Sequence, residues 1–109
     1  MPIRLVAVSD GKCVGTVTFI DNDFPGKTYT PWLGGLYVDV PYRNRGIGRS
    51  LIERVKQIAK DMGYNEVYLG TDNAGQYYKR LGWECVETGL ITPYGDSDNQ
   101  MCEIYKYDL

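Results

Sequence analysis

Histidine is absent from the 109-residue chain. Mechanisms that need an imidazole base, including Ser-His-Asp triads and Cys-His pairs, are therefore excluded, and so are most catalytic zinc sites. Cysteine is scarce as well: Cys13, Cys85 and Cys102 form no CxxC pair, and their number is odd. We therefore expect no metal site and no disulfide framework. Reduced thiols of this kind indicate a cytoplasmic protein.

Long hydrophobic runs are also missing. No apolar segment is long enough to cross a bilayer, and the first residues lack the apolar stretch of a secretion signal. Positive charge is not in excess, because 12 Lys and Arg minus 14 Asp and Glu give a net charge of −2. A nucleic-acid-binding face needs such an excess. We therefore expect neither a membrane nor a nucleic acid as partner.

What the chain does contain fits one domain of the α/β class. Its length and its 43% hydrophobic content suffice for one core and not for two. The residue patterns predict strands over 3–8, 13–20, 32–40, 66–69, 83–90 and 101–107, and helices after Ile47 and over 74–81. The order β-β-β-α-β-α-β-β predicts a mixed sheet, antiparallel at its start, with a parallel pair around the crossover helix.

Two local features sharpen this outline. Gly34 and Gly35 lie inside the third strand, where paired glycines indicate a bulge or a close approach of another group. The first helix has one apolar face at helical spacing, and Gly63 is expected to end it. The residues of that face are Ile47, Leu51, Val55, Ile58, Ala59 and Met62.

Positive charge and unhindered backbone gather where the third strand meets this helix. Arg43, Arg45 and Arg49 surround Gly46 and Gly48 in the stretch VPYRNRGIGRS. The start of a helix leaves backbone N–H groups unpaired and carries the positive end of the helix dipole, which favours a bound anion. Glycines let a ligand approach the amides, and guanidinium grips phosphate oxygens bidentately. The junction predicts a pyrophosphate site.

Two common phosphate loops do not fit this junction. The P-loop pattern GxxxxGK[ST] is absent, and the dinucleotide pattern GxGxxG lacks its third glycine after Gly46 and Gly48. ATP and NAD are therefore poor candidates. Taken alone, the Arg-x-x-Gly-x-Gly motif of residues 43–48 also fits an ordinary strand-to-helix turn with a solvated basic rim.

Two motifs in order resemble the GNAT superfamily of N-acetyltransferases. The stretch LYVDVPYRNRGIGRSLIERVKQIAKDMGYNEVYL, residues 36–69, resembles the acetyl-CoA-binding core of that family. The stretch YYKRLGWE, residues 77–84, resembles its downstream Tyr-x-x-x-Gly-[Phe/Trp] segment. The resemblance implies a GNAT-like sheet, a single acetyl-CoA-binding domain over 1–109, and acetyl-CoA (coenzyme A) as co-substrate.

The resemblance also implies which residues contact the cofactor. Backbone groups at the end of the third strand would hold the pantetheine arm, and the helix start would lie against the pyrophosphate. A side chain after the next strand would touch the cofactor as well. By position these residues are Val38, Val40, Arg43, Arg45, Gly46, Ile47, Gly48, Arg49, Ser50 and Asn73.

Tyr78 occupies the position of the family's proton donor. In such enzymes a neutral amine attacks the thioester directly, and a phenol with a pKa of about 10 is a reasonable acid toward the departing thiolate. The alternative reading of Tyr78 is a packing aromatic on a short helix, and the adjacent Tyr77 fits that reading better. The sequence identifies no general base.

The implied reaction is transfer of an acetyl group to a primary amine of a small molecule or peptide. A non-catalytic acyl-CoA-binding or regulatory module is the second reading. Family members usually begin with a strand and two helices that wall the acceptor site, and this sequence starts almost at the hairpin. The resemblance therefore leaves open an exposed acceptor site, a homodimer that completes the site, or lost catalysis.

Overall fold

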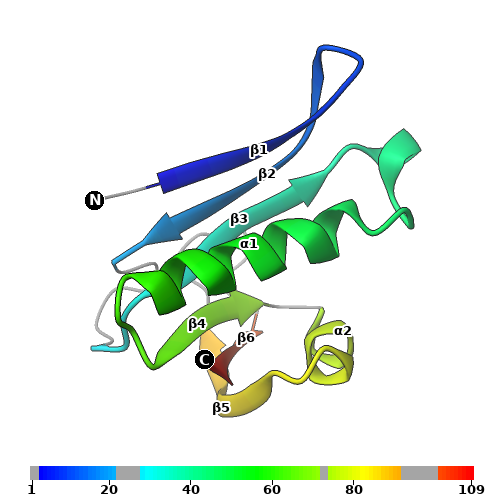
Figure 1. Ribbon diagram of the computed structural model, residues 1–109. Helices are drawn as coiled ribbons and strands as arrows, with labels where there is room; N and C mark the ends of the chain where they lie inside the picture. Colours follow the sequence, from blue (N-terminus) through cyan, green and yellow to red (C-terminus); the bar gives the residue numbers. More distant parts are fainter. Residues whose placement is uncertain (1–2, 22–27, 72–73, 92–100) are drawn as a thin grey trace.

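The computed structural model describes residues 3–21, 28–71, 74–91 and 101–109 (Figure 1). Within these ranges the predicted order of strands and helices is confirmed, with a short 3-10 turn added before the first helix. The elements are β1 (Ile3–Ser9), β2 (Lys12–Ile20), β3 (Trp32–Val38), η1 (Val40–Tyr42), α1 (Ile47–Asp61), β4 (Glu66–Thr71), α2 (Gly75–Arg80), β5 (Glu84–Ile91) and β6 (Met101–Asp108).

The strands form one sheet in the order β1-β2-β3-β4-β6-β5. β3 and β4 are parallel, with α1 as their crossover connection, and the other neighbouring strands are antiparallel. α1 packs against β1 to β4, and α2 packs against β5 and β6 (Figure 1). The predicted mixed sheet with a parallel pair around a crossover helix is confirmed.

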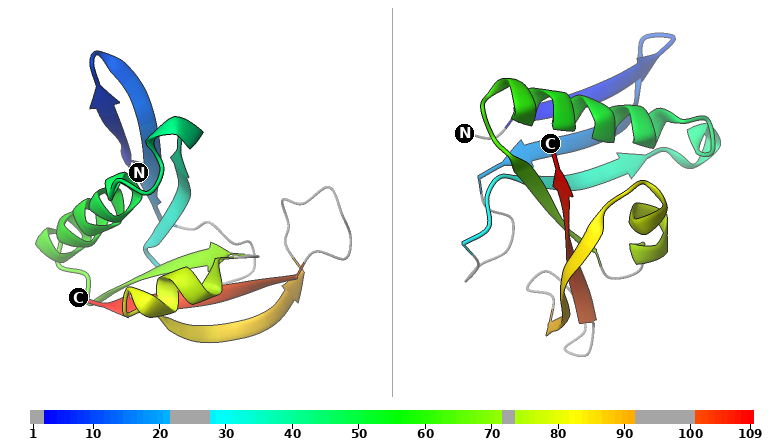
Figure 2. Two further views of the ribbon diagram at one scale, coloured as in Figure 1. Left: turned by 90° about the vertical axis from the view of Figure 1, so that its right-hand side faces the viewer. Right: turned by 60° about the horizontal axis from the view of Figure 1, so that its bottom comes forward.

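The parallel pair is joined at one end only. In β3 and β4, Trp32 alone is aligned with a residue of the other strand, Tyr68, and the Tyr68 amide donates to the carbonyl of Pro31 at 3.0 Å. Beyond this point the strands separate, and the left view of Figure 2 shows β1–β3 and β4–β6 as two parts of the sheet that turn away from each other. Within the described residues, the edge of β3 that faces β4 therefore has no partner strand toward Val38.

The bulge predicted in β3 lies at Gly35. The register between β2 and β3 shifts by one residue between the pairs Thr16–Tyr37 and Thr18–Gly34, and Gly35 has a φ of 60°. Residues with a side chain rarely adopt such a φ, so glycine is suited to hold the extra residue. A bulge bends its strand and increases the local twist, which favours the departure of β3 from β4.

β3 ends earlier than the sequence predicts. The strand stops at Val38, and Val40 begins the η1 turn, in which the Tyr42 amide donates to the Asp39 carbonyl at 2.8 Å. Pro41 follows, and its fixed φ and missing N–H suit a turn better than a strand. The prediction that the strand extends to Val40 is therefore wrong.

α1 covers the sheet with one apolar face, which the sequence predicts in part. Ile52 is 1% exposed although the predicted face omits it, because α1 packs against core side chains on two sides. Met62 is 48% exposed although the predicted face includes it. The helix has ended by then, since Gly63 adopts a φ of 92° and its amide donates to the Lys60 carbonyl at 3.0 Å.

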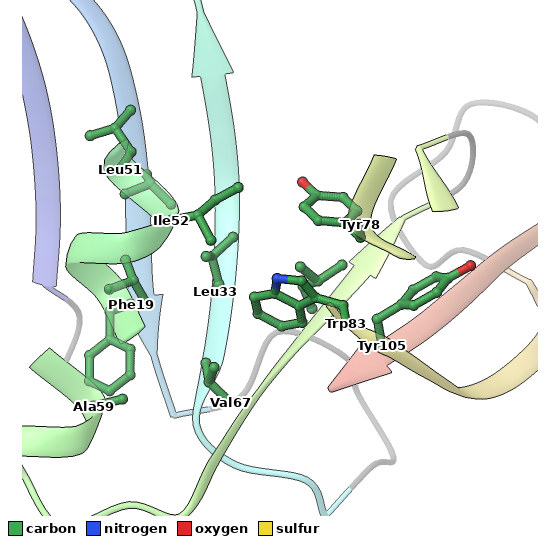
Figure 3. Packing of buried hydrophobic residues seen from close by; sticks show 12 residues of the cluster. Phe19, Leu33, Leu51, Ile52, Ala59, Val67, Tyr78, Trp83 and Tyr105 are labelled. Atoms are coloured by element: carbon green, nitrogen blue, oxygen red, sulfur yellow. The ribbon is translucent and has the colours of Figure 1, made fainter. Parts of the chain in front are cut away.

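The core lies between the sheet and the two helices (Figure 3). Burial of each large apolar side chain stabilises the fold by about 1.5–3 kcal/mol. The cluster therefore fixes α1 and α2 relative to the diverging strands, and it brings Trp83 and Tyr78 into one packed group. Its buried members include Phe19, Leu33, Leu51, Ile52, Val55, Ala59, Val67, Leu69, Tyr78, Trp83 and Tyr105.

Candidate functional site

A cleft of about 720 Å³ opens where the end of β3, the start of α1 and the helix α2 meet. Residues from all three elements line it, although they lie far apart in the sequence. The structure thus brings the strand-to-helix junction and the YYKRLGWE segment together at one place. The predicted site residues that line the cleft are Val38, Arg43, Gly46, Ile47, Gly48, Arg49 and Tyr78.

The start of α1 presents free backbone donors to this cleft. The Ser50 amide donates to the carbonyl of Gly46 at 3.0 Å and begins the hydrogen-bond ladder of the helix. The amides of Ile47, Gly48 and Arg49 precede this bond and have no acceptor within the helix. Among the residues that the structure describes, no side chain caps this end of the helix. Together with the helix dipole, these donors favour an anion in the cleft.

The two glycines at this end have different structural roles. Gly46 has a φ of 81°, a conformation that residues with a side chain rarely adopt. Gly48 instead keeps the cleft wide, because a Cβ added there would lie 3.6 Å from Val38 Cγ2 and 4.0 Å from the Tyr77 hydroxyl. The cleft therefore passes between α1 and α2 at Gly48.

The arginines divide between the cleft and its surroundings. Arg43 and Arg49 line the cleft. Arg45 and Ser50 line a neighbouring shallower depression, which Arg49 and Arg54 also line, and the Arg45 guanidinium lies 5.4 Å from the centre of the Tyr42 ring. The positive charge predicted at this junction is thus present on both sides of the helix start.

The backbone of Val38 faces the gap between β3 and β4. The next residue, Asp39, donates its amide to the Val14 carbonyl of β2 at 2.8 Å. Backbone groups of successive strand residues point to opposite sides, so those of Val38 point away from β2 and toward β4. Val40 does not share this position, because it is 66% exposed and its carbonyl accepts the Arg43 amide at 3.2 Å.

Tyr78 projects from α2 into the aromatic part of the core and reaches the cleft (Figure 3). Its side chain is 7% exposed and packs against the rings of Tyr77, Trp83 and Tyr105. Burial, followed by the neighbouring Tyr77, raises the pKa of Tyr78 to about 12. The hydroxyl is therefore protonated throughout the neutral range, which is the state that a proton donor requires.

Tyr77 belongs to the cleft as well as to the core. It is half-buried against the core, as the sequence suggests, but it also lines the cleft opposite Gly48. Ala74 and Leu81 line the cleft too. The spacing of these residues is that of one helix face, and this spacing is the signal by which the sequence could have assigned Tyr77 to the site.

Three further predictions concern Asn73, metal binding and the membrane. Asn73 lies outside the residues that the structure describes. In the described part of the chain, no group of three His, Cys, Asp or Glu residues is placed to hold a metal ion. Of the helices in the same residues, neither has the length and apolar character needed to span a membrane.

The family model and the similar proteins found by comparison point to the same family. Residues 2–83 match the sequence model described as "Acetyltransferase (GNAT) family". The human protein N-acetyltransferase 8B is 39% identical over 84 residues, which cover 72% of this chain and 37% of that protein. The chain thus spans well under half the length of this curated relative.

Solved structures show the same fold. A putative streptothricin acetyltransferase of Bacillus anthracis in complex with acetyl coenzyme A superposes with a TM-score of 0.81 and 22% identity, over 99% of this chain and 62% of that one. Arabidopsis thaliana Naa50 in complex with the bisubstrate analogue CoA-Ac-MVNAL has a TM-score of 0.78 and 22% identity, over 97% and 72% of the two chains. The predicted GNAT-like fold is confirmed.

Proposed function

Because this chain belongs to the GNAT family of acetyltransferases, we propose that it binds acetyl-CoA in the cleft and transfers the acetyl group to a primary amine. The observation that carries the proposal is the convergence at one cleft of three features. These features are the free amides of α1 with their arginines, the unpaired edge of β3, and the protonated hydroxyl of Tyr78. We also propose that residues 1–109 act as one acetyl-CoA-binding domain.

The residues of the cleft fit the chemical groups of acetyl-CoA. The amides of Ile47, Gly48 and Arg49 offer donors to a diphosphate, and Gly48 leaves room for it to approach. The backbone of Val38 offers a strand edge to the amides of a pantetheine arm. Arg45 and Ser50 adjoin the same helix start and are positioned for an outer phosphate. The roles of Val40 and Asn73 stay predictions from the resemblance.

The proposed chemistry is direct transfer. Acetyl-CoA supplies a thioester carbon that a neutral amine can attack, so that a C–N bond forms and the C–S bond breaks. Tyr78 donates its proton to the departing sulfur, and the amine loses a proton to solvent or to a base that the sequence does not identify. Tyr78 holds its proton at neutral pH, and its pKa of about 12 makes it a weaker acid than an ordinary phenol, so the proposal rests on its place at the cleft.

The proposed acceptor is a primary amine of a peptide or small molecule. The related Naa50 structure holds an analogue that joins CoA to a peptide, which favours a peptide acceptor. The sequence pI near 5.0 slightly favours a cationic amine through electrostatic steering. A homodimer that completes the acceptor side is part of this proposal, and sedimentation of the purified protein tests it.

Calorimetric titration with acetyl-CoA is the experiment that tests the proposal, with NAD and ATP as control ligands. We expect binding to acetyl-CoA alone. A panel of peptide and small-molecule amines, read by release of CoA, then identifies the acceptor class. Absence of acetyl-CoA binding would refute the proposal. Binding without CoA release across the panel would favour a non-catalytic acyl-CoA-binding module.

A further inference from the structure

The side chain of Arg43 forms a hydrogen bond with the edge of β3 that the cleft exposes. Its Nε donates to the carbonyl oxygen of Val38 at 2.8 Å. Its guanidinium also lies 5.4 Å from the ring centre of Tyr37, which is 52% exposed. Arg43 therefore leaves the loop after η1 and reaches back over the end of β3, instead of extending into solvent.

This contact occupies an acceptor that a ligand in the cleft would need. The backbone of Val38 points toward the gap between β3 and β4, as the bond from Asp39 to Val14 on the other side requires. An amide-bearing arm that pairs with β3 would donate to this same carbonyl. In the structure, the Nε–H of Arg43 takes the place of that donor.

The contact is weak enough to be exchanged for a better one. Arg43 is exposed to solvent, and its partner is a neutral carbonyl. The present bond carries charge on its donor only, whereas a phosphate oxygen would supply charge on the acceptor as well and can be gripped by the guanidinium bidentately. A diphosphate at the start of α1 would offer Arg43 that alternative, because Arg43 lines the same cleft as Gly46 and Gly48.

We infer that Arg43 is a specificity-determining residue that holds the Val38 carbonyl until a diphosphate draws it away. The inference rests on the proposed function. In this arrangement, an acyl thioester with a diphosphate releases the strand edge as it binds. A thioester that lacks phosphate, such as acetyl-pantetheine, must compete with the guanidinium for the carbonyl. Arg43 therefore opposes phosphate-free thioesters and favours acyl-CoA.

Binding of two ligands to four proteins tests this inference. Acetyl-CoA and acetyl-pantetheine are titrated calorimetrically into the wild type and into Arg43→Ala, Arg49→Ala and Arg4→Ala, with competition against acetyl-CoA where direct heats are small. Arg49 lines the cleft but makes no bond to Val38, and the exposed Arg4 of β1 lines neither the cleft nor the depression beside it. The two control variants thus remove one positive charge, as Arg43→Ala does, but leave the hydrogen bond from Arg43 to Val38 in place.

The inference predicts opposite changes for the two ligands in one variant. In Arg43→Ala, acetyl-CoA binds more weakly, whereas acetyl-pantetheine binds about fivefold more tightly, which corresponds to about 1 kcal/mol for one hydrogen bond. In Arg49→Ala, acetyl-CoA binds more weakly and acetyl-pantetheine is unaffected. In Arg4→Ala, neither affinity changes by more than about twofold.

The outcomes separate this inference from the proposed function. If Arg43→Ala weakens acetyl-CoA binding but does not tighten acetyl-pantetheine binding, Arg43 is only a phosphate ligand, and the inference fails while the proposed function stands. If the wild type does not bind acetyl-CoA, both fail.

Nuclear magnetic resonance of the arginine Nε–H groups gives an independent measurement. The Arg43 signal, assigned by its loss in Arg43→Ala, should exchange slowly with water in the free protein and shift on addition of CoA. Pantetheine at equal concentration should shift it far less. A signal that exchanges with water in the free protein as fast as that of the exposed Arg4 would overturn the inference.

Discussion

The two ends of the β3–β4 pair have opposite properties, although they belong to the same two strands. At the closed end, Trp32 and Tyr68 are aligned and buried, and Tyr29 stacks on Tyr68 with ring centres 4.6 Å apart. At the open end, no strand among the described residues pairs with Val38 on its β4 side, and the residues around it line a cleft. One end of the strand pair is thus packed into the core, and the other is open to the proposed ligand.

A substitution at the closed end should have the largest effect on the free energy of unfolding. Trp32 is 0% exposed, so Trp32→Ala leaves a large cavity and should lower the free energy of unfolding by about 3–5 kcal/mol. Tyr37→Ala, at the exposed open end, is the matched control and should change it by about 0.5 kcal/mol or less. Urea denaturation measures both. Equal losses would show that the two ends are not distinct.

Tyr78 tests whether the open end performs chemistry as well as binding. Tyr78→Phe removes the hydroxyl that carries the proposed proton and keeps the ring that packs against Trp83 and Tyr105. We expect kcat to fall about 100-fold, the lower part of the range for a general acid, with little change in acetyl-CoA affinity. Steady-state kinetics and calorimetry provide the two readouts. Unchanged kcat would remove the proton-donor role.

Charge reversal compares the cleft with a surface away from it. Arg49→Glu places a carboxylate in the cleft, where it would repel a diphosphate, and should weaken acetyl-CoA binding by at least about tenfold. Arg4→Glu makes the same change of charge on the exposed part of β1 and should have a much smaller effect. The difference between them should shrink at high salt, because exposed charges are screened. Similar losses in both variants would point to general electrostatic attraction only.

Gly48 provides the finest test. An alanine there meets Val38 and Tyr77 at ordinary contact distances, so Gly48→Ala should fold and gain up to about 1 kcal/mol of helix stability. It narrows the cleft, however, and should weaken acetyl-CoA binding a few-fold. Gly46→Ala should instead lose stability, because of its positive φ. Thermal unfolding distinguishes the two glycines. Tighter binding of acetyl-CoA by Gly48→Ala would contradict the proposal that the ligand passes between α1 and α2 at Gly48.

The sequence predicts those features that depend on local patterns. The alternation of apolar and polar residues and the apolar face of α1 predict the order of elements and the parallel pair around α1. The paired glycines in β3 predict the bulge at Gly35. The start of α1 is equally readable, since Gly46, Gly48 and the arginines are contiguous. A local pattern reports what one segment tends to do alone, and these features need little more.

Features that depend on contacts between residues far apart in the sequence cannot be predicted from such local patterns. Ile52 is buried because α1 packs into the core on a second flank, and the sequence does not show that flank. The single alignment of Trp32 with Tyr68 depends on how two strands meet across a crossover of more than twenty residues. The bond from Arg43 to Val38 depends on one rotamer of a long side chain.

The open edge of β3 also bears on aggregation. An exposed strand edge is a template on which other chains can add strands. This edge lies inside the sheet, and the start of α1 and the helix α2 flank it at the cleft. Within the described residues β4 still pairs with the other end of β3, at Trp32, so only the stretch toward Val38 is open to pairing. The fold thus exposes a short strand edge at the cleft and not the long, flat edge that favours aggregation.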